Sequence, residues 1–243
     1  MYQDDIFHIS IHYFKFWMIH QVITLTMSIF YLWKMRTLSV EKMLLCIEKV
    51  LLMDVIILNG ASSSGKSTIA KELQAQLPEY FLHIGIDTFI AMMPEHANCL
   101  SSPDVVADGF YWQTLPTENG SVQRIRSGDY GKRVNTVYHS TINHFANMGL
   151  KVIIDDVMNG GAEQLSWRAA LKELDVIFVG VMCSDEELLR REKLRDDRVN
   201  GSALEQNSRV HTNVEYDLTV SSTENSVLEC AQQIATYITN TGY

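Results

Sequence analysis

From about residue 54 onward, short apolar runs alternate with stretches in which apolar residues recur every three or four positions. The first pattern is typical of buried strands, the second of amphipathic helices. Strands are expected at 54–59, 81–86, 151–155, 176–181 and 216–220. Helices are expected at 66–77, 88–93, 132–148 and 162–172, after the capping box Ser184–Glu187, and around 227–238. The stretch 95–130, with two prolines and three glycines, is expected to be rich in loops.

This alternation of strands and helices predicts one α/β domain. Nearly continuous apolar strands are typical of a parallel sheet that is covered by helices on both faces. The expected architecture is therefore three layers, α/β/α, around about five parallel strands. Ligands of such sheets bind at the carboxyl ends of the strands, so functional residues are sought directly after each strand.

The first expected strand leads into Gly60–Thr68, which matches the phosphate-loop pattern G-x-x-x-x-G-K-[ST] between a strand and a helix. Gly60 and Gly65 permit a backbone course that a side chain would hinder, and loop N–H groups together with a helix N-terminus bind anions. Lys66 adds a charge for the outer phosphates, and the Ser67 hydroxyl suits Mg²⁺. The residues expected to bind the nucleotide are Gly60, Ser62, Ser63, Ser64, Gly65, Lys66, Ser67 and Thr68.

Acidic residues follow two other strands. Asp87 comes after the second strand, where its carboxylate would lie beside the phosphate loop and suit a base for an attacking hydroxyl. An aspartate in this position is also a common helix cap. Asp155 and Asp156 end the third strand, and an apolar strand that ends in Asp is the usual Walker B arrangement for Mg²⁺. Neighbouring strand residues face opposite sides, so the pattern leaves open which of the two serves the metal.

A run of charged residues covers 190–198 and includes Arg195 and Arg198. Such a run is often a solvated helix face. It also stands where a mobile lid would lie, and lid arginines would neutralise the transferred phosphoryl group and exclude water. Both interpretations remain open.

Residues 1–52 differ from the rest of the chain. Residues 16–33 are eighteen positions without a formal charge, at the lower limit of length for a membrane span. Asp4 and Asp5 replace the basic start of a signal peptide. Three interpretations are open: an upstream stretch that results from a misassigned start codon ahead of Met53, a helix that packs on the domain or a partner, or a membrane anchor. An anchor would leave the main domain, 53–243, in the cytoplasm.

Composition narrows the function classes. The 243 residues carry a net charge of −9, which argues against general binding of nucleic acid. Four scattered cysteines without C-x-x-C spacing predict neither a zinc site nor a disulfide framework. A reducing cytoplasm is therefore the expected location.

Five short blocks stand in order along the chain: Ile57–Ser67, Gly85–Asp87, Ile153–Val157, Asp197–Gly201 and Val214–Asp217. Together they resemble the chloramphenicol phosphotransferase-like kinases of the P-loop NTPase superfamily, over residues 54–238. The resemblance implies an ATP- and Mg²⁺-dependent kinase that phosphorylates a hydroxyl group of a small molecule. In the family's type member this is a primary hydroxyl of chloramphenicol, and phosphorylation inactivates the drug.

The resemblance also implies roles for single residues. It makes Asp87 the catalytic aspartate, which would act together with Lys66 of the phosphate loop. It also makes Arg195 and Arg198 phosphate contacts on a lid at about 190–201. The stretch 95–130 keeps little of the family pattern. Five of its residues or near neighbours either line the acceptor pocket or belong to the core: Met92, Met93, Phe110, Tyr111 and Trp112.

The acceptor therefore stays open between chloramphenicol, with a role in antibiotic resistance, and an unknown housekeeping hydroxyl compound. Two other functions compete. One is a nucleotide or metabolite kinase of the adenylate or shikimate kinase type, which shares the fold. The other is a regulatory ATPase module; the chain has no Asn-Lys-x-Asp motif, which counts against a GTPase switch.

Overall fold

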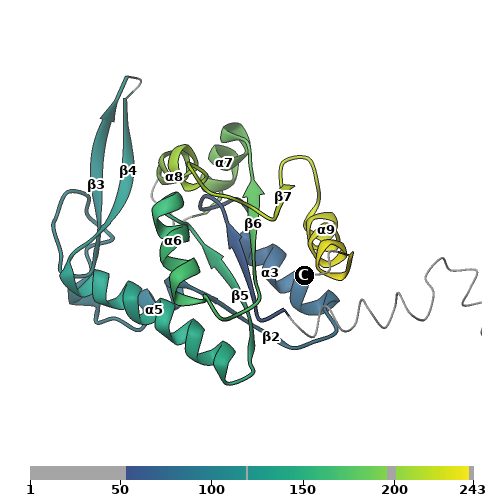
Figure 1. Ribbon diagram of the computed structural model, residues 1–243. Helices are drawn as coiled ribbons and strands as arrows, with labels where there is room; N and C mark the ends of the chain where they lie inside the picture. The colour runs from purple at the N-terminus through teal and green to yellow at the C-terminus, as the bar shows by residue number, and fades with distance from the viewer. Residues whose placement is uncertain (1–52, 119, 196–200, 241–243) are drawn as a thin grey trace, which may run out of the picture. The chain divides into compact units, whose positions relative to one another are not determined.

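The computed structural model describes residues 53–118, 120–195 and 201–240. Its main sheet has five strands in the order β2-β5-β1-β6-β7, and every neighbouring pair is parallel (Figure 1). The strands are β1 (Val55–Asn59), β2 (Phe81–Gly85), β5 (Lys151–Asp156), β6 (Val176–Met182) and β7 (Leu218–Ser221). The parallel sheet expected from the apolar runs is thus confirmed, with strand ends shifted by one or two residues.

Helices cover both faces of this sheet. Alternate residues of β1 face opposite sides: Ile56 and Leu58 pack in a core that includes Leu73, whereas Ile57 packs in a separate core that includes Trp167. The first core lies under α3 (Lys66–Gln76) and α9 (Val227–Asn240), and the second under α4 (Ile86–Ala91), α5 (Asp129–Asn147) and α6 (Gly161–Ala170). The predicted three-layer α/β/α architecture is confirmed.

The stretch 95–130 is more ordered than expected. After a 3₁₀ turn at Glu95–Ala97, the strands β3 (Phe110–Thr117) and β4 (Gly120–Ser127) form an antiparallel hairpin that extends beyond the main sheet (Figure 1). The prediction of a loop-rich segment is wrong for these two strands, whereas 98–109 contains no helix or strand. Proline and glycine usually interrupt regular structure, and the hairpin contains Pro116 and Gly120. Both stand next to the turn of a two-stranded ribbon, where a missing N–H and a backbone φ of 134° are tolerated.

The helix α7 (Asp185–Glu192) begins at the predicted cap, Ser184. After the run of charged residues comes a second helix, α8 (Ser202–Val210), which the apolar pattern did not reveal. Glu192 is buried and accepts hydrogen bonds from Gly201 N at 2.8 Å and Ala203 N at 2.9 Å, so it caps α8. Glu192 is therefore no part of a solvated face, although its neighbours Arg190 and Leu194 are exposed.

Some predicted features fall on residues outside the described ranges. They include the uncharged stretch 16–33 and the part of the expected lid that carries Arg198. Among the helices that the structure describes, none has the length and apolarity to cross a membrane.

Candidate functional site

One cavity of about 1260 Å³ opens at the carboxyl ends of the strands. Ligand pockets usually measure roughly 300–1,000 Å³, so this one has room for a nucleotide and a second molecule. Its walls come from the phosphate loop, the ends of β2 and β5, the hairpin, and the helices α4, α5, α7 and α8. The edge where sequence analysis placed the functional residues is therefore a real concave site.

The phosphate loop has the backbone needed to face an anion. Ser63 and Gly65 adopt positive φ angles of 63° and 93°. Gly60 passes so close to β6 that a Cβ there would lie 2.6 Å from the carbonyl oxygen of Val181. Glycine is therefore required at these two positions for different physical reasons. At Gly65 the backbone adopts a positive φ angle, and at Gly60 there is no space for a side chain.

Polar groups of the loop are held in place or left without partners. Lys66 donates from Nζ to the carbonyl oxygen of Ala61 at 2.6 Å, and Gln206 of α8 accepts from Ser62 N at 2.7 Å. The buried hydroxyl oxygens of Ser63 and Ser64 have no hydrogen-bond partner among the described residues. Orphaned hydroxyls, together with the unpaired first N–H groups of α3, fit a phosphate chain.

Six of the eight predicted loop contacts line the cavity, namely Ser62, Ser63, Gly65, Lys66, Ser67 and Thr68. Gly60 and Ser64 do not, although both shape the loop.

The two aspartates at the end of β5 face opposite sides of the sheet. Asp155 turns toward α3, where its Oδ2 accepts a hydrogen bond from the hydroxyl of Ser67, and its Oδ1 lies 3.4 Å from Nε2 of His83. Burial raises the pKa of Asp155, but the contacts with His83 and Ser67 outweigh burial, and the net pKa lies below the usual range. Asp155 is therefore kept ionised beside the phosphate loop.

Asp156 turns toward the other layer. Its Oδ2 accepts from Nε1 of Trp167 at 2.7 Å, its Oδ1 accepts from Val157 N at 2.9 Å, and its side chain is nearly fully buried. Burial raises the pKa of Asp156, and the hydrogen bonds with Trp167 and Val157 offset this only in part. Asp156 lines the cavity, but both of its oxygens already have partners within the protein.

Ser67 and Asp155 fit a magnesium ion. Mg²⁺ prefers hard oxygen ligands, and it usually takes one or two protein ligands along with water and substrate phosphates. The described residues contain no cluster of three or more His, Cys, Asp or Glu side chains suited to a metal. A hydroxyl and a carboxylate at the phosphate loop match the smaller donor set of a nucleotide-bound Mg²⁺.

Asp87 lies in the first turn of α4, exposed at the cavity. The helix is preceded by Gly85, and no side-chain cap bond is formed there, so Asp87 is not the cap of α4. Asp87 and the phosphate loop line the same cavity, although β5 lies between β1 and β2, the strands that precede the loop and Asp87.

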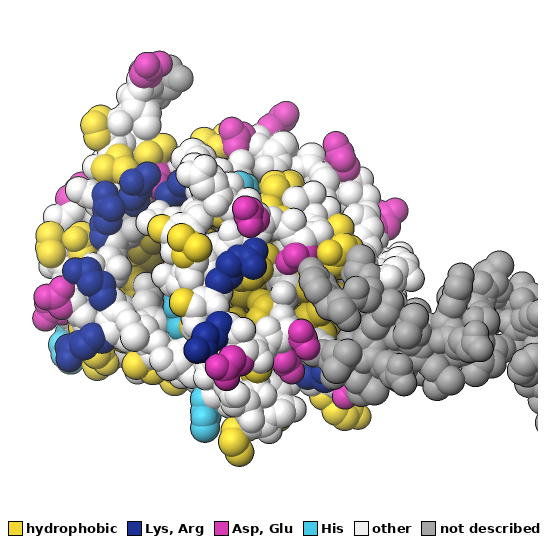
Figure 2. Space-filling model, viewed as in Figure 1, with side chains coloured by type: hydrophobic (Ala, Val, Ile, Leu, Met, Phe, Trp, Pro, Cys, Tyr) yellow, Lys and Arg dark blue, Asp and Glu magenta, His cyan; other side chains and the backbone are white. Residues whose placement is uncertain are grey.

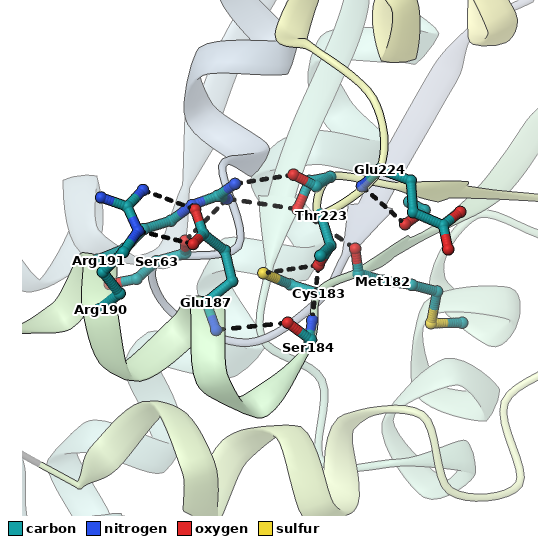
Figure 3. A network of polar contacts seen from close by, with 11 residues as sticks. Ser63, Met182, Cys183, Ser184, Glu187, Arg190, Arg191, Thr223 and Glu224 are labelled. Carbon is teal, nitrogen blue, oxygen red and sulfur yellow. Dashed lines mark hydrogen bonds and ion pairs between the residues drawn. The ribbon is translucent and has the colours of Figure 1, made fainter.

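Arg191 ties α7 to the phosphate loop. Its Nη2 donates to the carbonyl oxygen of Ser222 at 2.7 Å, and its Nη1 lies 3.5 Å from the carbonyl oxygen of Ser63 (Figure 3). Glu187 accepts from Arg191 Nε at 2.6 Å and also pairs with Arg190, which points away from the loop. Arg191 therefore holds the helix, the loop and the turn before α9 together at one end of the cavity.

Of the two predicted lid arginines, only Arg195 lies within the described residues. Arg195 is exposed and lines the same cavity as Arg191. Arg198 lies outside the described residues.

The hairpin supplies part of the cavity wall. Phe110 and Trp112 are buried and also line the cavity, so both interpretations of these residues apply. Met92, Met93 and Tyr111 do not line it.

Glu163 on α6 is a site residue that the sequence reasoning missed. It lines the cavity, and its Oε2 accepts from Asn159 N at 2.7 Å. Burial, followed by the neighbouring charge of Asp156, raises the pKa of Glu163 to about 7. Its carboxyl group is therefore partly protonated near neutral pH.

Tyr138 on α5 was missed as well. Its side chain is 1% exposed, it lines the cavity, and its hydroxyl has no hydrogen-bond partner among the described residues. Burial and then the charges of Asp156 and Asp155 raise its pKa well above the usual value. Tyr138 appeared in the sequence only as one apolar position of a helix face. Nothing local distinguishes it from a core tyrosine, because the cavity forms only when α5 packs on the sheet.

Known proteins resemble this chain over most of its length. The family model described as chloramphenicol phosphotransferase-like protein matches residues 53–239. The curated protein "Putative O-phosphotransferase Rv2636" of Mycobacterium tuberculosis is 31% identical over 192 residues, which cover 74% of this chain and 80% of that protein.

Solved structures with a similar fold are more distant in sequence. The tunicamycin resistance protein of Deinococcus radiodurans has a TM-score of 0.51 at 15% identity, covering 76% of this chain and 95% of its own. The APS kinase CysC of Mycobacterium tuberculosis, in complex with AMPPNP and APS, has a TM-score of 0.50 at 13% identity, and the match covers 76% of this chain and 97% of the kinase chain. A sugar kinase of Janibacter has a TM-score of 0.50 at 16% identity, and the match covers 76% of this chain and 94% of the sugar kinase chain. These likenesses show the P-loop kinase fold.

Proposed function

This chain belongs to the chloramphenicol phosphotransferase-like family, and from that premise we propose that it transfers the γ-phosphoryl group of ATP to a hydroxyl group of a small molecule. One observation carries the proposal. A single cavity brings together the phosphate loop, the Ser67–Asp155 pair and Asp87, although these residues come from three separate strand ends.

The donor half of the site is the loop and its neighbours. The loop N–H groups, Lys66 and Arg191 hold the phosphates and position the γ-phosphoryl group; Arg195, and by resemblance Arg198, stabilise its charge during transfer. Ser67 and Asp155 would hold Mg²⁺, which would supply positive charge to neutralise the phosphates. Asp156 positions the end of β5 through its bond with Trp167.

The acceptor half begins at Asp87. The acceptor's hydroxyl oxygen forms a bond to the γ-phosphorus, the bond from this phosphorus to the β–γ bridging oxygen breaks, and ADP leaves. Asp87 accepts the hydroxyl proton. Because little covalent chemistry falls to the protein, most of the rate enhancement comes from positioning and electrostatics.

The proposal is tested by incubating the full chain with γ-³²P-ATP, Mg²⁺ and a panel of hydroxyl compounds that includes chloramphenicol and nucleosides. Mass spectrometry of a labelled product would locate the phosphate. We expect Asp87→Asn to keep ATP binding and to lose transfer by orders of magnitude, because the neutral amide cannot take the proton. Asp108→Asn, an exposed position outside the cavity, serves as the control.

The same assay separates the alternatives. Phosphorylation of a nucleoside or nucleotide in preference to other alcohols would assign a nucleotide kinase. Hydrolysis of ATP at the same rate with every acceptor would instead assign a regulatory ATPase and overturn the proposal. Near-normal turnover of Asp87→Asn would remove Asp87 from the role of base.

A further inference from the structure

The cavity wall formed by β4 and the start of α5 is basic. Arg124 and Arg126 stand two residues apart on β4, and Lys132 lies in the first part of α5; all three line the cavity. On the face drawn in Figure 2, Lys and Arg side chains gather around a hollow near the base of the projecting hairpin. This basic wall, defined as Arg124, Arg126 and Lys132, has no part in holding the ATP phosphates in the proposed function.

The carboxylates near the basic wall do not balance its charge. Glu205 of α8, whose side chain is 2% exposed, accepts hydrogen bonds from both Arg124 Nε and Arg209 Nε. One buried carboxylate thus serves two guanidinium groups. This pair of arginines keeps an excess positive charge, and Glu205 also fixes the hairpin against α8.

Arg126 has a neutral partner. It donates from Nε to Oε1 of Gln113 at 2.7 Å, and no carboxylate in the described part of the chain forms an ion pair with it. Lys132 pairs with Asp129 at 3.0 Å, but the side chains are 67% and 92% exposed, so solvent screens this pair. The wall therefore presents guanidinium and ammonium groups that are available to an anion.

A polar group elsewhere in the lining of this cavity also lacks a partner among the described residues. The Tyr138 hydroxyl is almost fully buried, lines the same cavity and has no hydrogen-bond partner among the described residues. A buried hydroxyl without a partner is costly, so a polar ligand group or a water molecule is needed there.

We propose that the acceptor carries an anionic group, a phosphate or a carboxylate, in addition to the hydroxyl that receives the phosphoryl group, and that Arg126, Arg124 and Lys132 bind this anion. The inference rests on the proposed function and specifies its substrate class. The planar guanidinium group suits both anions, because it donates two parallel hydrogen bonds to a carboxylate or phosphate. The Tyr138 hydroxyl contacts the polar part of the acceptor between this anion and Asp87.

The first test uses acceptors that differ only in the anion: glycerol, glycerol 3-phosphate and glycerate, and glucose, glucose 6-phosphate and gluconate, with chloramphenicol as an uncharged reference. We expect KM for an anionic member to be at least about tenfold lower than for its uncharged partner. Arg126→Gln should raise this KM about tenfold, with kcat and the KM for ATP little changed. Arg133→Gln, next to Lys132 but outside the cavity, should match the wild type.

Uncharged acceptors that are used as well as the anionic ones, with the same KM in Arg126→Gln as in the wild type, would overturn the inference while leaving the proposed function intact. Absence of transfer to every acceptor would instead count against the proposed function, and the anion site is then tested by binding.

The second test needs no turnover. Inorganic sulfate is titrated into the protein in the presence of AMPPNP, which occupies the phosphate loop, and binding is followed by calorimetry. We expect sulfate to bind the wild type and Arg133→Gln equally and Arg126→Gln about tenfold more weakly. Equal binding by Arg126→Gln, or no binding by the wild type, would overturn the inference.

Discussion

Ser67 in the first turn of α3 donates a hydrogen bond to Asp155 at the end of β5, across 88 positions of the chain. The adjacent Asp156 faces the opposite layer and is bound to Trp167. The two carboxylates therefore differ in environment although they are neighbours in sequence: Asp155 lies at the phosphate loop, whereas Asp156 is bound to a helix of the opposite layer.

This difference predicts opposite effects of one substitution. Asp155→Asn should lower kcat on the order of 100-fold, because it removes a charge that holds Mg²⁺ near the phosphates, while urea unfolding changes by less than about 1 kcal/mol. Asp156→Asn should keep most of the turnover, because an amide oxygen still accepts from Trp167 and only the hydrogen bond from Val157 N is lost. Steady-state kinetics and urea unfolding of both variants test this. Loss of turnover in Asp156→Asn alone would reverse the assignment.

Gly85 keeps the Asp155 carboxylate in place. A Cβ at Gly85 would lie 2.1 Å from Oδ1 and 2.9 Å from the backbone oxygen of Asp155. We expect Gly85→Ala to displace this carboxylate and to lower turnover by roughly 100-fold, since a shift of about 1 Å at a reacting site has this effect. Leu82→Ala, at an exposed position of the same strand, is the control. Unchanged turnover of Gly85→Ala would show that the position of Asp155 does not matter.

Arg190 and Arg191 offer a matched pair, because both bind Glu187 but only Arg191 reaches Ser63 and Ser222 (Figure 3). Arg191→Ala should raise the KM for ATP about tenfold, the size expected when a charged hydrogen-bonding group is lost. Arg190→Ala should leave this KM close to the wild-type value, because its side chain is 62% exposed. Equal effects of both substitutions would mean that Arg191 acts only through Glu187.

Glu163 should make stability depend on pH. Its pKa is raised from 4.5 to about 7 in the folded protein, first by burial and then by the charge of Asp156. The folded state therefore holds the proton more tightly, and the stability contributed by this group is complete below about pH 4.5 and is lost as pH rises through about 7.

The variant Glu163→Gln isolates this contribution, since it carries no charge at any pH. We expect it to unfold with nearly the wild-type free energy at pH 4.5 and to be more stable than the wild type at pH 8, by up to roughly 2 kcal/mol after screening by solvent in the cavity. Urea unfolding at several pH values measures the difference. A difference that does not change with pH would contradict the raised pKa.

The hairpin of β3 and β4 could not be predicted from the sequence. In Phe110–Thr117 and Gly120–Ser127, proline and glycine masked a regular strand pattern, and no apolar alternation marks Arg124 and Arg126 as one wall of a cavity. Arg124 donates a hydrogen bond to Glu205, which lies 81 positions further along the chain. Such pairings depend on how α8 docks, which no local pattern records.

The phosphate loop, the five strands of the main sheet and the three layers could be predicted from the chain alone. They rest on short-range causes: the backbone freedom of two glycines, the two-residue period of strands and the 3.6-residue period of helices. The assignment of Asp155 rather than Asp156 to the loop, of Arg191 to Ser63, and of Tyr138 to the cavity needed the folded protein. Each depends on which face of the sheet a distant helix covers, because a side chain acquires its chemical role from the groups that packing brings within a few ångströms of it.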